Sequence, residues 1–89
     1  MVTSIILLTT DRLKVNDVAQ KLTDIKGISE VYSVSGNYDL VAIVRVDTND
    51  ELADLVTNSF VEIDGIETTD TMLAFKAYSK HDLESMFSV

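Results

Sequence analysis

The spacing of apolar residues changes twice within the first third of the chain. Residues 3–9 form an apolar run of strand length, and residues 29–34 form a shorter run rich in β-branched and aromatic side chains. Between these runs, apolar residues recur at the spacing of one helix face: Val15, Val18, Ala19, Leu22 and Ile25. Gly27 follows, at a position where glycine often ends a helix. The segment therefore predicts a strand, a helix and a second strand.

The second half of the chain repeats this order. Residues 38–46 alternate, and one face of the predicted strand is made of Tyr38, Leu40, Ala42, Val44 and Val46. Its other face carries Asp39, Val41, Ile43 and Arg45. A helix is predicted to begin after Thr48, which forms a capping-box pattern with Glu51, and to end at Gly65. A last strand is predicted over residues 67–78.

An offset of 38 residues relates the two halves, because it aligns Gly27 with Gly65 and the two helical patterns with each other. A duplicated strand–helix–strand unit gives the order βαββαβ. This order is that of the ferredoxin-like α+β fold, which has a four-stranded antiparallel sheet. Right-handed crossovers place both helices on the same face of such a sheet.

The other face of the predicted sheet is left uncovered by this chain. Its predicted lining is Val41, Ile43, Thr69, Thr71, Leu73 and Phe75. A face this apolar is expected to be buried against another surface, so we expect two copies to pack face to face as a dimeric α/β barrel. An extra C-terminal helix is predicted after Ser79, and its apolar edge could contact a neighbouring copy: Leu83, Met86 and Phe87.

The composition predicts one small domain, residues 1–89, with an acidic surface. A chain of 89 residues has a thin core, which makes oligomerisation a natural source of further burial. Its net charge of −8 disfavours direct binding to nucleic acids and to anionic membranes. Cysteine is absent, and the first apolar run is too short for a membrane span and lacks the flanks of a signal peptide. We expect a cytoplasmic protein.

Three short motifs, in this order and on this frame, resemble the ligand-binding domain of the leucine-responsive regulator/AsnC (Lrp/AsnC) family. They are Ser35-Gly36-Asn37-Tyr38-Asp39-Leu40, Ile63-Asp64-Gly65-Ile66 and Thr68-Thr69-Asp70-Thr71-Met72-Leu73. The resemblance, which spans residues 3–79, is to the RAM domain (regulation of amino acid metabolism). It implies an effector-sensing domain with a role in transcription regulation. By the same resemblance, an amino acid binds at the interfaces between dimers, which assemble into an octamer or a similar ring.

The resemblance also implies which residues bind the ligand. They are Gly36, Asn37, Tyr38, Asp39, Thr69, Thr71 and Met72. Because the chain begins directly at the first strand, we expect no helix-turn-helix and no DNA binding of its own. The domain could then act by co-assembling with full-length relatives or on another target.

Each candidate residue also has a structural interpretation. Gly36 and Asn37 suit a two-residue hairpin turn, and Gly36 could also expose backbone N–H groups to a carboxylate. Asp39 could bind the ammonium group of an amino acid or form an ion pair with Arg45. Tyr38 alternates with core residues and is predicted to pack in the core, with its hydroxyl reaching the edge. The threonines are ordinary strand residues, and neighbouring Asp70 is predicted on the helix side or in solvent.

Catalytic chemistry has little support in the sequence, and we expect a protein that is not an enzyme. No metal is expected, because the single histidine, His81, lacks partners at ligand spacing; no cofactor is expected either. No serine has a base at a matching position. The main alternative is a small cofactor-independent enzyme of the dimeric α+β barrel type, such as a monooxygenase or isomerase. A third possibility is an ACT-type amino-acid-binding domain, in which the sheets pair side by side.

Overall fold

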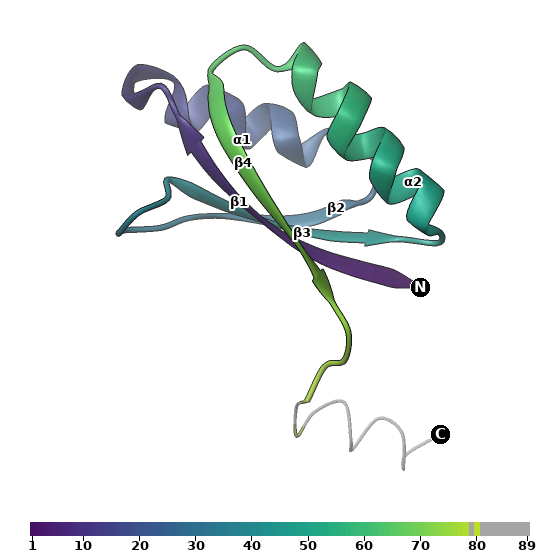
Figure 1. Ribbon diagram of the computed structural model, residues 1–89. Helices are drawn as coiled ribbons and strands as arrows, with labels where there is room; N and C mark the ends of the chain where they lie inside the picture. Colours follow the sequence, from purple (N-terminus) through teal and green to yellow (C-terminus); the bar gives the residue numbers. More distant parts are fainter. Residues whose placement is uncertain (79, 81–89) are drawn as a thin grey trace.

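The computed structural model describes residues 1–78 and 80. These residues form four strands and two main helices in the predicted order (Figure 1). The elements are β1 (Val2–Thr10), η1 (Arg12–Lys14), α1 (Val15–Thr23), β2 (Ile28–Ser33), β3 (Leu40–Val46), α2 (Asn49–Asp54), η2 (Leu55–Ser59), η3 (Phe60–Glu62) and β4 (Ile66–Ala74). The predicted C-terminal helix, with its apolar edge and His81, lies outside the described residues apart from Lys80.

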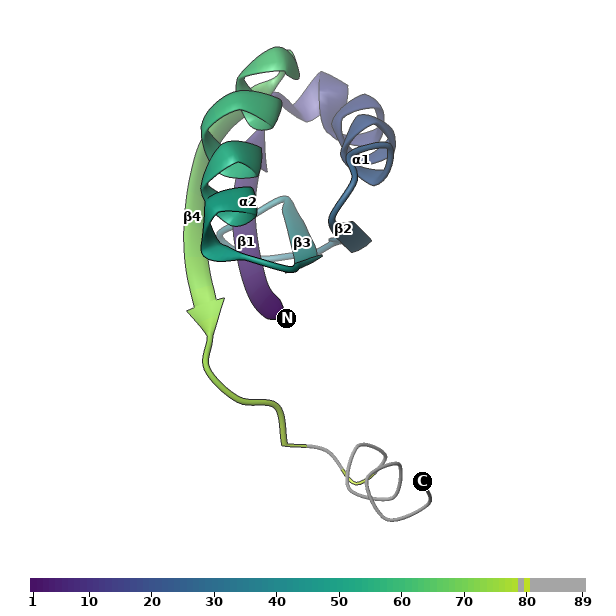
Figure 2. The ribbon, with the colours of Figure 1, turned by 90° about the vertical axis from the view of Figure 1, so that its right-hand side faces the viewer.

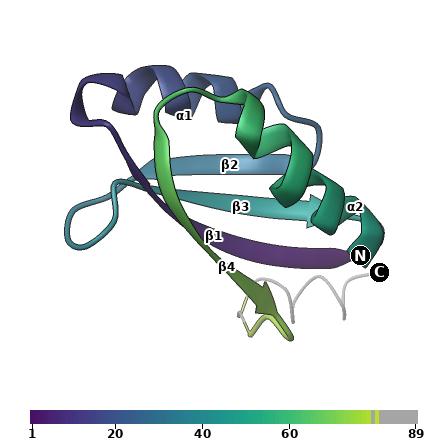
Figure 3. The ribbon, with the colours of Figure 1, turned by 45° about the horizontal axis from the view of Figure 1, so that its top comes forward.

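The four strands form one antiparallel sheet in the order β2-β3-β1-β4, with both helices on one face (Figures 1 and 3). This arrangement confirms the predicted ferredoxin-like α+β fold. The two most apolar strands, β1 and β3, lie at the centre of the sheet, whereas β2 and β4 form its edges. β4 pairs with β1 in continuous register from Thr3 and Ala74 to Thr9 and Thr68, and the register shifts after Thr9.

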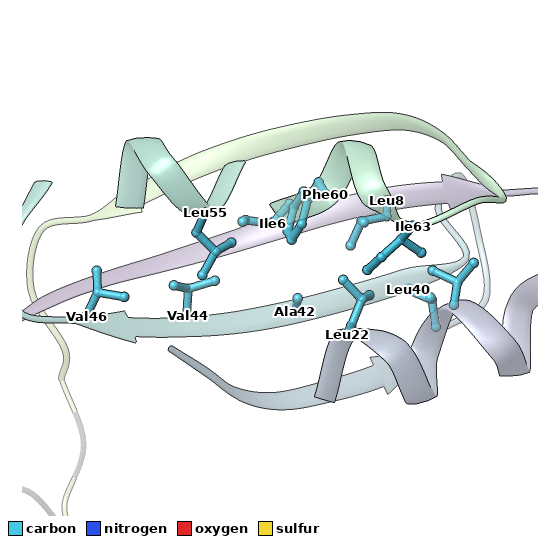
Figure 4. Close-up of a cluster of buried hydrophobic side chains, with 11 residues drawn as sticks. Ile6, Leu8, Leu22, Leu40, Ala42, Val44, Val46, Leu55, Phe60 and Ile63 are labelled. Carbon is cyan, nitrogen blue, oxygen red and sulfur yellow. The ribbon is translucent and has the colours of Figure 1, made fainter. Parts of the chain in front are cut away.

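The core lies between the sheet and the two helices (Figure 4). Its buried apolar side chains are Ile6, Leu8, Val18, Leu22, Leu40, Ala42, Val44, Val46, Leu55, Phe60 and Ile63. Every second residue of β1 and β3 points into it; the sequence predicted this alternation for β3, whereas β1 was predicted from a continuous apolar run. Ser4 is also buried on this face, and its hydroxyl donates to the carbonyl of Met72 at 2.7 Å. Burial of alternate residues therefore fixes which face of the central strands meets the helices.

The second helix begins as predicted and then changes its winding. The side chain of Thr48 accepts from the backbone N–H of Glu51 at 3.1 Å, and the Glu51 carboxylate accepts from the N–H of Asp47 at 3.1 Å. After Asp54 the chain continues through the π-helical η2 and the 3₁₀-helical η3. The sequence predicted one continuous helix here, because the apolar stripe carries on through all three segments.

Gly27 connects α1 to β2 in a conformation that favours glycine, with φ of 102°. Its carbonyl accepts from the backbone N–H of Arg45 at 2.7 Å, which joins the end of α1 to the end of β3. A Cβ atom at this position would lie 2.7 Å from Cγ1 of Val46 and 3.3 Å from Cδ1 of Leu55. The close approach of the turn to the core therefore requires glycine for both space and backbone geometry.

The open face of the sheet differs from the prediction at β4. Residues directly opposite each other in an antiparallel pair share a face. Thr69 and Thr71 pair with Leu8 and Ile6, which point to the helices, so these threonines also lie on the helix side. Leu73 pairs with Ser4 and lies there too, whereas Phe75 follows the end of β4. The predicted placement of these four residues on the open face is wrong.

The open face is formed instead by the alternate residues of each strand. On β1 and β3 they are Thr3, Ile5, Leu7, Thr9, Val41, Ile43 and Arg45. On β4 they are Thr68, Asp70, Met72 and Ala74, and on β2 they include Glu30 and Tyr32. Asp70 was predicted on the helix side or in solvent, and the structure places it at the exposed edge of this open face. The face remains largely apolar at its centre, so the case for covering it is unchanged.

Candidate functional site

The loop between β2 and β3 carries four of the seven predicted ligand-binding residues. The N–H of Val34 donates to the carbonyl of Asp39 at 3.0 Å. This hydrogen bond closes the loop, and four residues, 35–38, lie between the two that it joins. The predicted two-residue turn is therefore wrong. Gly36 has a φ of 110°, but Asn37 has a negative φ, whereas a tight type I′ turn needs positive values at both positions. A Cβ atom at Gly36 would meet nothing within 4 Å, so the tip of the loop is open.

Asp39 fixes the base of this loop to the end of β1. Its N–H donates to the carbonyl of Leu8 at 2.9 Å, and its carboxylate oxygen Oδ2 accepts from the N–H of Thr10 at 2.8 Å. The alternative ion pair with Arg45 is absent among the described residues. Six residues of extended strand separate the two, about 20 Å at roughly 3.3 Å per residue. Asp39 therefore has a structural role whether or not it also contacts a ligand.

Tyr38 connects the loop to β4 across the open face. Its hydroxyl donates to the carboxylate of Asp70 at 3.2 Å. This hydrogen bond, with the negative charge of Asp70, raises the pKa of Tyr38, because ionisation would remove the donor and create a like charge. Tyr38 is half-buried and does not belong to the buried core, contrary to the prediction. The hydroxyls of Thr9 and Thr68 also contact each other, at 2.5 Å, on the same face.

The predicted residues thus divide between the two faces of the sheet. Tyr38 and Met72 belong to the open-face side, where Asp70 joins them. Thr69 and Thr71 lie on the opposite side, where Thr71 lines a groove against α2. The seven residues therefore do not converge on one pocket within a single copy of the chain.

Sequence reasoning missed two residues of this corner, Asp70 and Thr10. Asp70 was predicted in solvent or on the helix side; it is exposed but lies on the open face. The backbone of Thr10 contacts a side chain 29 positions away. The only available signal for Asp70 was its place at the centre of the Thr-Asp-Thr motif. Within the described part of the chain, the N–H groups of Gly36 and Asn37 donate to no protein acceptor. The corner thus offers backbone donors from the loop and a carboxylate from β4.

A second polar cluster lies on the open face at the opposite end of β3. Arg45 donates to the hydroxyl of Ser29 at 2.7 Å and pairs with Glu30 at 3.7 Å. The hydroxyl of Tyr32 also donates to Glu30, which raises the pKa of Tyr32. The sequence predicted mostly Val, Ile, Thr and Leu on this face. The charged groups of the cluster are about half exposed and satisfy one another, as in an ordinary surface ion pair.

A pocket of about 700 Å³ lies between the end of α1, the end of β3 and α2. Its lining residues are Ile25, Lys26, Gly27, Arg45, Val46, Asp47, Asp50, Glu51, Asp54, Leu55 and Ser59. None of the predicted ligand-binding residues contributes to it. Among the described residues, no three histidine, cysteine or acidic side chains are grouped as metal ligands. In the same part of the chain, no helix is long and apolar enough to cross a membrane.

Comparison with known proteins finds relatives in the same family as the resemblance seen in the sequence. A family profile described as the Lrp/AsnC ligand binding domain matches residues 3–83. The HTH-type transcriptional regulator FL11 of Pyrococcus furiosus is 35% identical over 71 residues, which are 75% of this chain and 44% of FL11. The chain thus spans less than half the length of this curated relative.

Solved structures agree with this assignment. Protein TTHA0845 of Thermus thermophilus is 39% identical, with a TM-score of 0.83 over 90% of this chain and all of that one. The feast or famine regulatory protein Rv3291c of M. tuberculosis, complexed with L-methionine, has a TM-score of 0.73 at 23% identity, over 90% of this chain and 54% of that one. At that identity the likeness concerns the fold alone. The family profile covers most of the chain, and the chain therefore belongs to the Lrp/AsnC family, as a ligand-binding domain of its kind.

Proposed function

We propose that this domain senses an amino acid at the corner formed by the β2–β3 loop and β4, within a symmetric assembly of copies. The observation that carries the proposal is the link between loop and strand: Tyr38 donates to Asp70 beside an open glycine turn. An amino acid presents one ammonium and one carboxylate group. The carboxylate of Asp70 suits the first, and the unused N–H groups of Gly36 and Asn37 suit the second.

Apolar surface for a ligand side chain lies next to these polar groups. Met72 is two residues from Asp70 on the same strand and face, and it is partly exposed in a single copy. Methionine adapts its shape to different apolar partners. The regulator Rv3291c, of the same fold, binds L-methionine, which supports an amino acid as the class of effector for this chain. Thr69 and Thr71 face the helices, so a contact between them and the same ligand would require a second copy.

We infer that assembly completes the site. In one copy the corner is a shallow exposed surface, whereas small ligands are normally held in concave sites that bury most of their area. The apolar centre of the open face provides the surface through which two copies would pack, with Ile5, Leu7 and Ile43 at its middle. A ligand bound between copies would favour one geometry of the assembly over another. That shift is the proposed regulatory output.

Thermal unfolding in the presence of each of the twenty amino acids tests this proposal. A ligand at 100 times its Kd adds about 2.7 kcal/mol to the free energy of unfolding, which raises the Tm by several degrees. We expect a small set of amino acids to produce this rise. Asp70→Asn keeps an acceptor for Tyr38 but removes the charge, so it should abolish the rise. Asp17→Asn, on the exposed side of α1, is the matched control and should keep it.

Two results would contradict the proposal. One is the absence of a rise in Tm with any amino acid. The other is an equal response of Asp70→Asn and Asp17→Asn to the ligand, which would place the binding site elsewhere. Sedimentation at micromolar concentration tests the assembly separately, and a monomer would refute packing through the open face.

The enzyme alternative has no specific observation in its favour. The relatives that match this chain carry the names of transcriptional regulators. The polar cluster around Glu30 is formed of paired groups at the surface, and its charged members are about half exposed, as in an ordinary surface ion pair.

A further inference from the structure

The chain beyond β4 runs away from the body of the domain as an extended arm, residues 75–78 (Figures 1 and 2). Two of its four side chains are aromatic, and they are almost entirely in solvent: Phe75 is 94% exposed and Tyr78 is 83% exposed. The Nζ atom of Lys76 lies 5.1 Å from the centre of the Tyr78 ring. Aromatic side chains contribute most to stability when they are buried, so an arm of this composition suits an interface.

A groove of matching character lies between α2 and β4 on the helix side of the sheet. It has a volume of about 390 Å³. Its lining residues are Asn49, Leu52, Ala53, Val56, Thr57, Thr71 and Leu73. Apolar groups form most of this lining, and Leu73 is 47% exposed although it points toward the helix layer. The groove thus leaves apolar surface uncovered in a single copy.

The arm and the body of the domain are also opposite in charge. Residues 1–74 contain thirteen acidic and five basic side chains, whereas residues 75–80 contain two lysines and no acidic residue. The groove lining itself carries no charged side chain, and the acidic residues of α2, Asp50, Glu51 and Asp54, line the other pocket. Complementary charge of this kind orients two surfaces as they associate. A basic aromatic segment therefore suits an apolar groove on a domain whose overall charge is negative.

We propose that the arm of one copy docks in the α2–β4 groove of a second copy. β4 ends at Ala74, the residue after Leu73 of the groove wall, and the arm continues away from that wall (Figure 2). To fill its own groove, the chain would have to reverse direction within the few residues after Leu73. A second copy can supply the arm without such a reversal. Reciprocal exchange makes the contact twofold symmetric and buries both arms.

The absence of cysteine from the sequence makes a direct test possible. One chain carries Tyr78→Cys and is labelled with ¹⁵N, and a second, unlabelled chain carries Thr57→Cys in the groove. After mixing, we expect mild oxidation to join position 78 of the labelled chain to position 57 of the other. Mass spectrometry identifies the linked peptides. In the control, Val61→Cys replaces Thr57→Cys, because Val61 is 78% exposed and lies outside the groove.

The expected difference in rate is large. A docked arm holds its thiol at an effective concentration in the millimolar range, so linkage at position 57 should be about a hundredfold faster than at position 61 when the protein is micromolar. Equal rates at the two positions would overturn the proposal. A disulfide formed within one chain of the double variant Tyr78→Cys/Thr57→Cys, in place of one between chains, would also overturn it.

Association measurements give an independent check. Phe75→Ala removes one aromatic side chain from the arm, and we expect the Kd of the assembly to rise about tenfold or more, as for an aromatic anchor. Leu13→Ala is the matched control, because Leu13 is also 94% exposed but lies on η1. An unchanged Kd for Phe75→Ala would refute the docked arm. The thermal response to amino acids is measured separately, so failure of the arm proposal and failure of amino acid sensing can be told apart.

Discussion

Alanine substitutions at Gly27 and Gly36 separate two energetic costs that usually occur together. One is the cost of an unfavourable backbone conformation, and the other is the cost of crowding in the core. Both glycines have a positive φ, 102° at Gly27 and 110° at Gly36, so each alanine must adopt an unfavourable backbone conformation. Their surroundings differ. A Cβ at Gly27 would lie 2.7 Å from Cγ1 of Val46, whereas a Cβ at Gly36 would meet nothing within 4 Å.

The two costs can be given magnitudes. The left-handed conformation costs a residue with a side chain about 1–2 kcal/mol, and this applies to both variants. Forcing an extra methyl group into a packed core costs about 1–3 kcal/mol more, and this applies only at Gly27. We therefore expect Gly36→Ala to lower the free energy of unfolding by about 1–2 kcal/mol and Gly27→Ala by about 2–5 kcal/mol. The total for a domain of this size is roughly 4–13 kcal/mol, so the second loss is substantial.

Urea unfolding followed by circular dichroism, at one fixed protein concentration, measures both variants. With a slope of about 1 kcal/mol per molar urea, the midpoints should differ by about 1–3 M. The double variant Gly27→Ala/Val46→Ala removes the methyl group that the new Cβ would touch. Its loss should therefore be smaller than the sum of the two single losses. Equal midpoints for Gly27→Ala and Gly36→Ala, or additive losses in the double variant, would refute the reasoning.

Three further predictions concern the loop and the core. Asp39→Ala removes the carboxylate that accepts from the N–H of Thr10 at the end of β1. In urea unfolding it should lower the free energy of unfolding by about 1–2 kcal/mol, whereas Asp39→Asn, which keeps an acceptor, should lower it less. The raised pKa of Tyr38 means that its hydrogen bond stabilises the fold fully below pH 10, its ordinary pKa, and that this stability is lost as pH rises through the folded pKa. In an NMR titration of the tyrosine rings, Asp70→Asn should return that pKa toward 10. Ile6→Ala should cost about 2–5 kcal/mol because the side chain is fully buried, while Ile5→Ala, on the open face, should mainly raise the Kd of assembly, as sedimentation would show.

The sequence predicts the fold well because β3 has one fully apolar face. Every core-facing position of β3 is apolar, whereas its other face mixes Val41 and Ile43 with the charged Arg45. β4 has no such asymmetry, since Thr68, Thr69 and Thr71 place polar groups on both of its faces. Its orientation is set by pairing with β1, about 60 residues away, and local spacing does not contain that register.

The candidate site was predicted in part for a related reason. Gly36, Asn37, Tyr38 and Asp39 were identified from a local motif, and they do form one loop. The partners of that loop, Thr10 and Asp70, come from strands distant in sequence, so no spacing rule could pair them with it. Which of these residues touch a ligand is still a prediction.

The β2–β3 loop projects from the sheet and is joined to it at its base and through the bond from Tyr38 to Asp70. None of the side chains between the closing bond and its tip is part of the buried core. Substitutions of Ser35 and Asn37, which flank Gly36 at the tip, can therefore change its chemistry with little loss of folding free energy. Related proteins could diverge in effector preference by altering a few positions there, while selection on the packed interior keeps the scaffold constant.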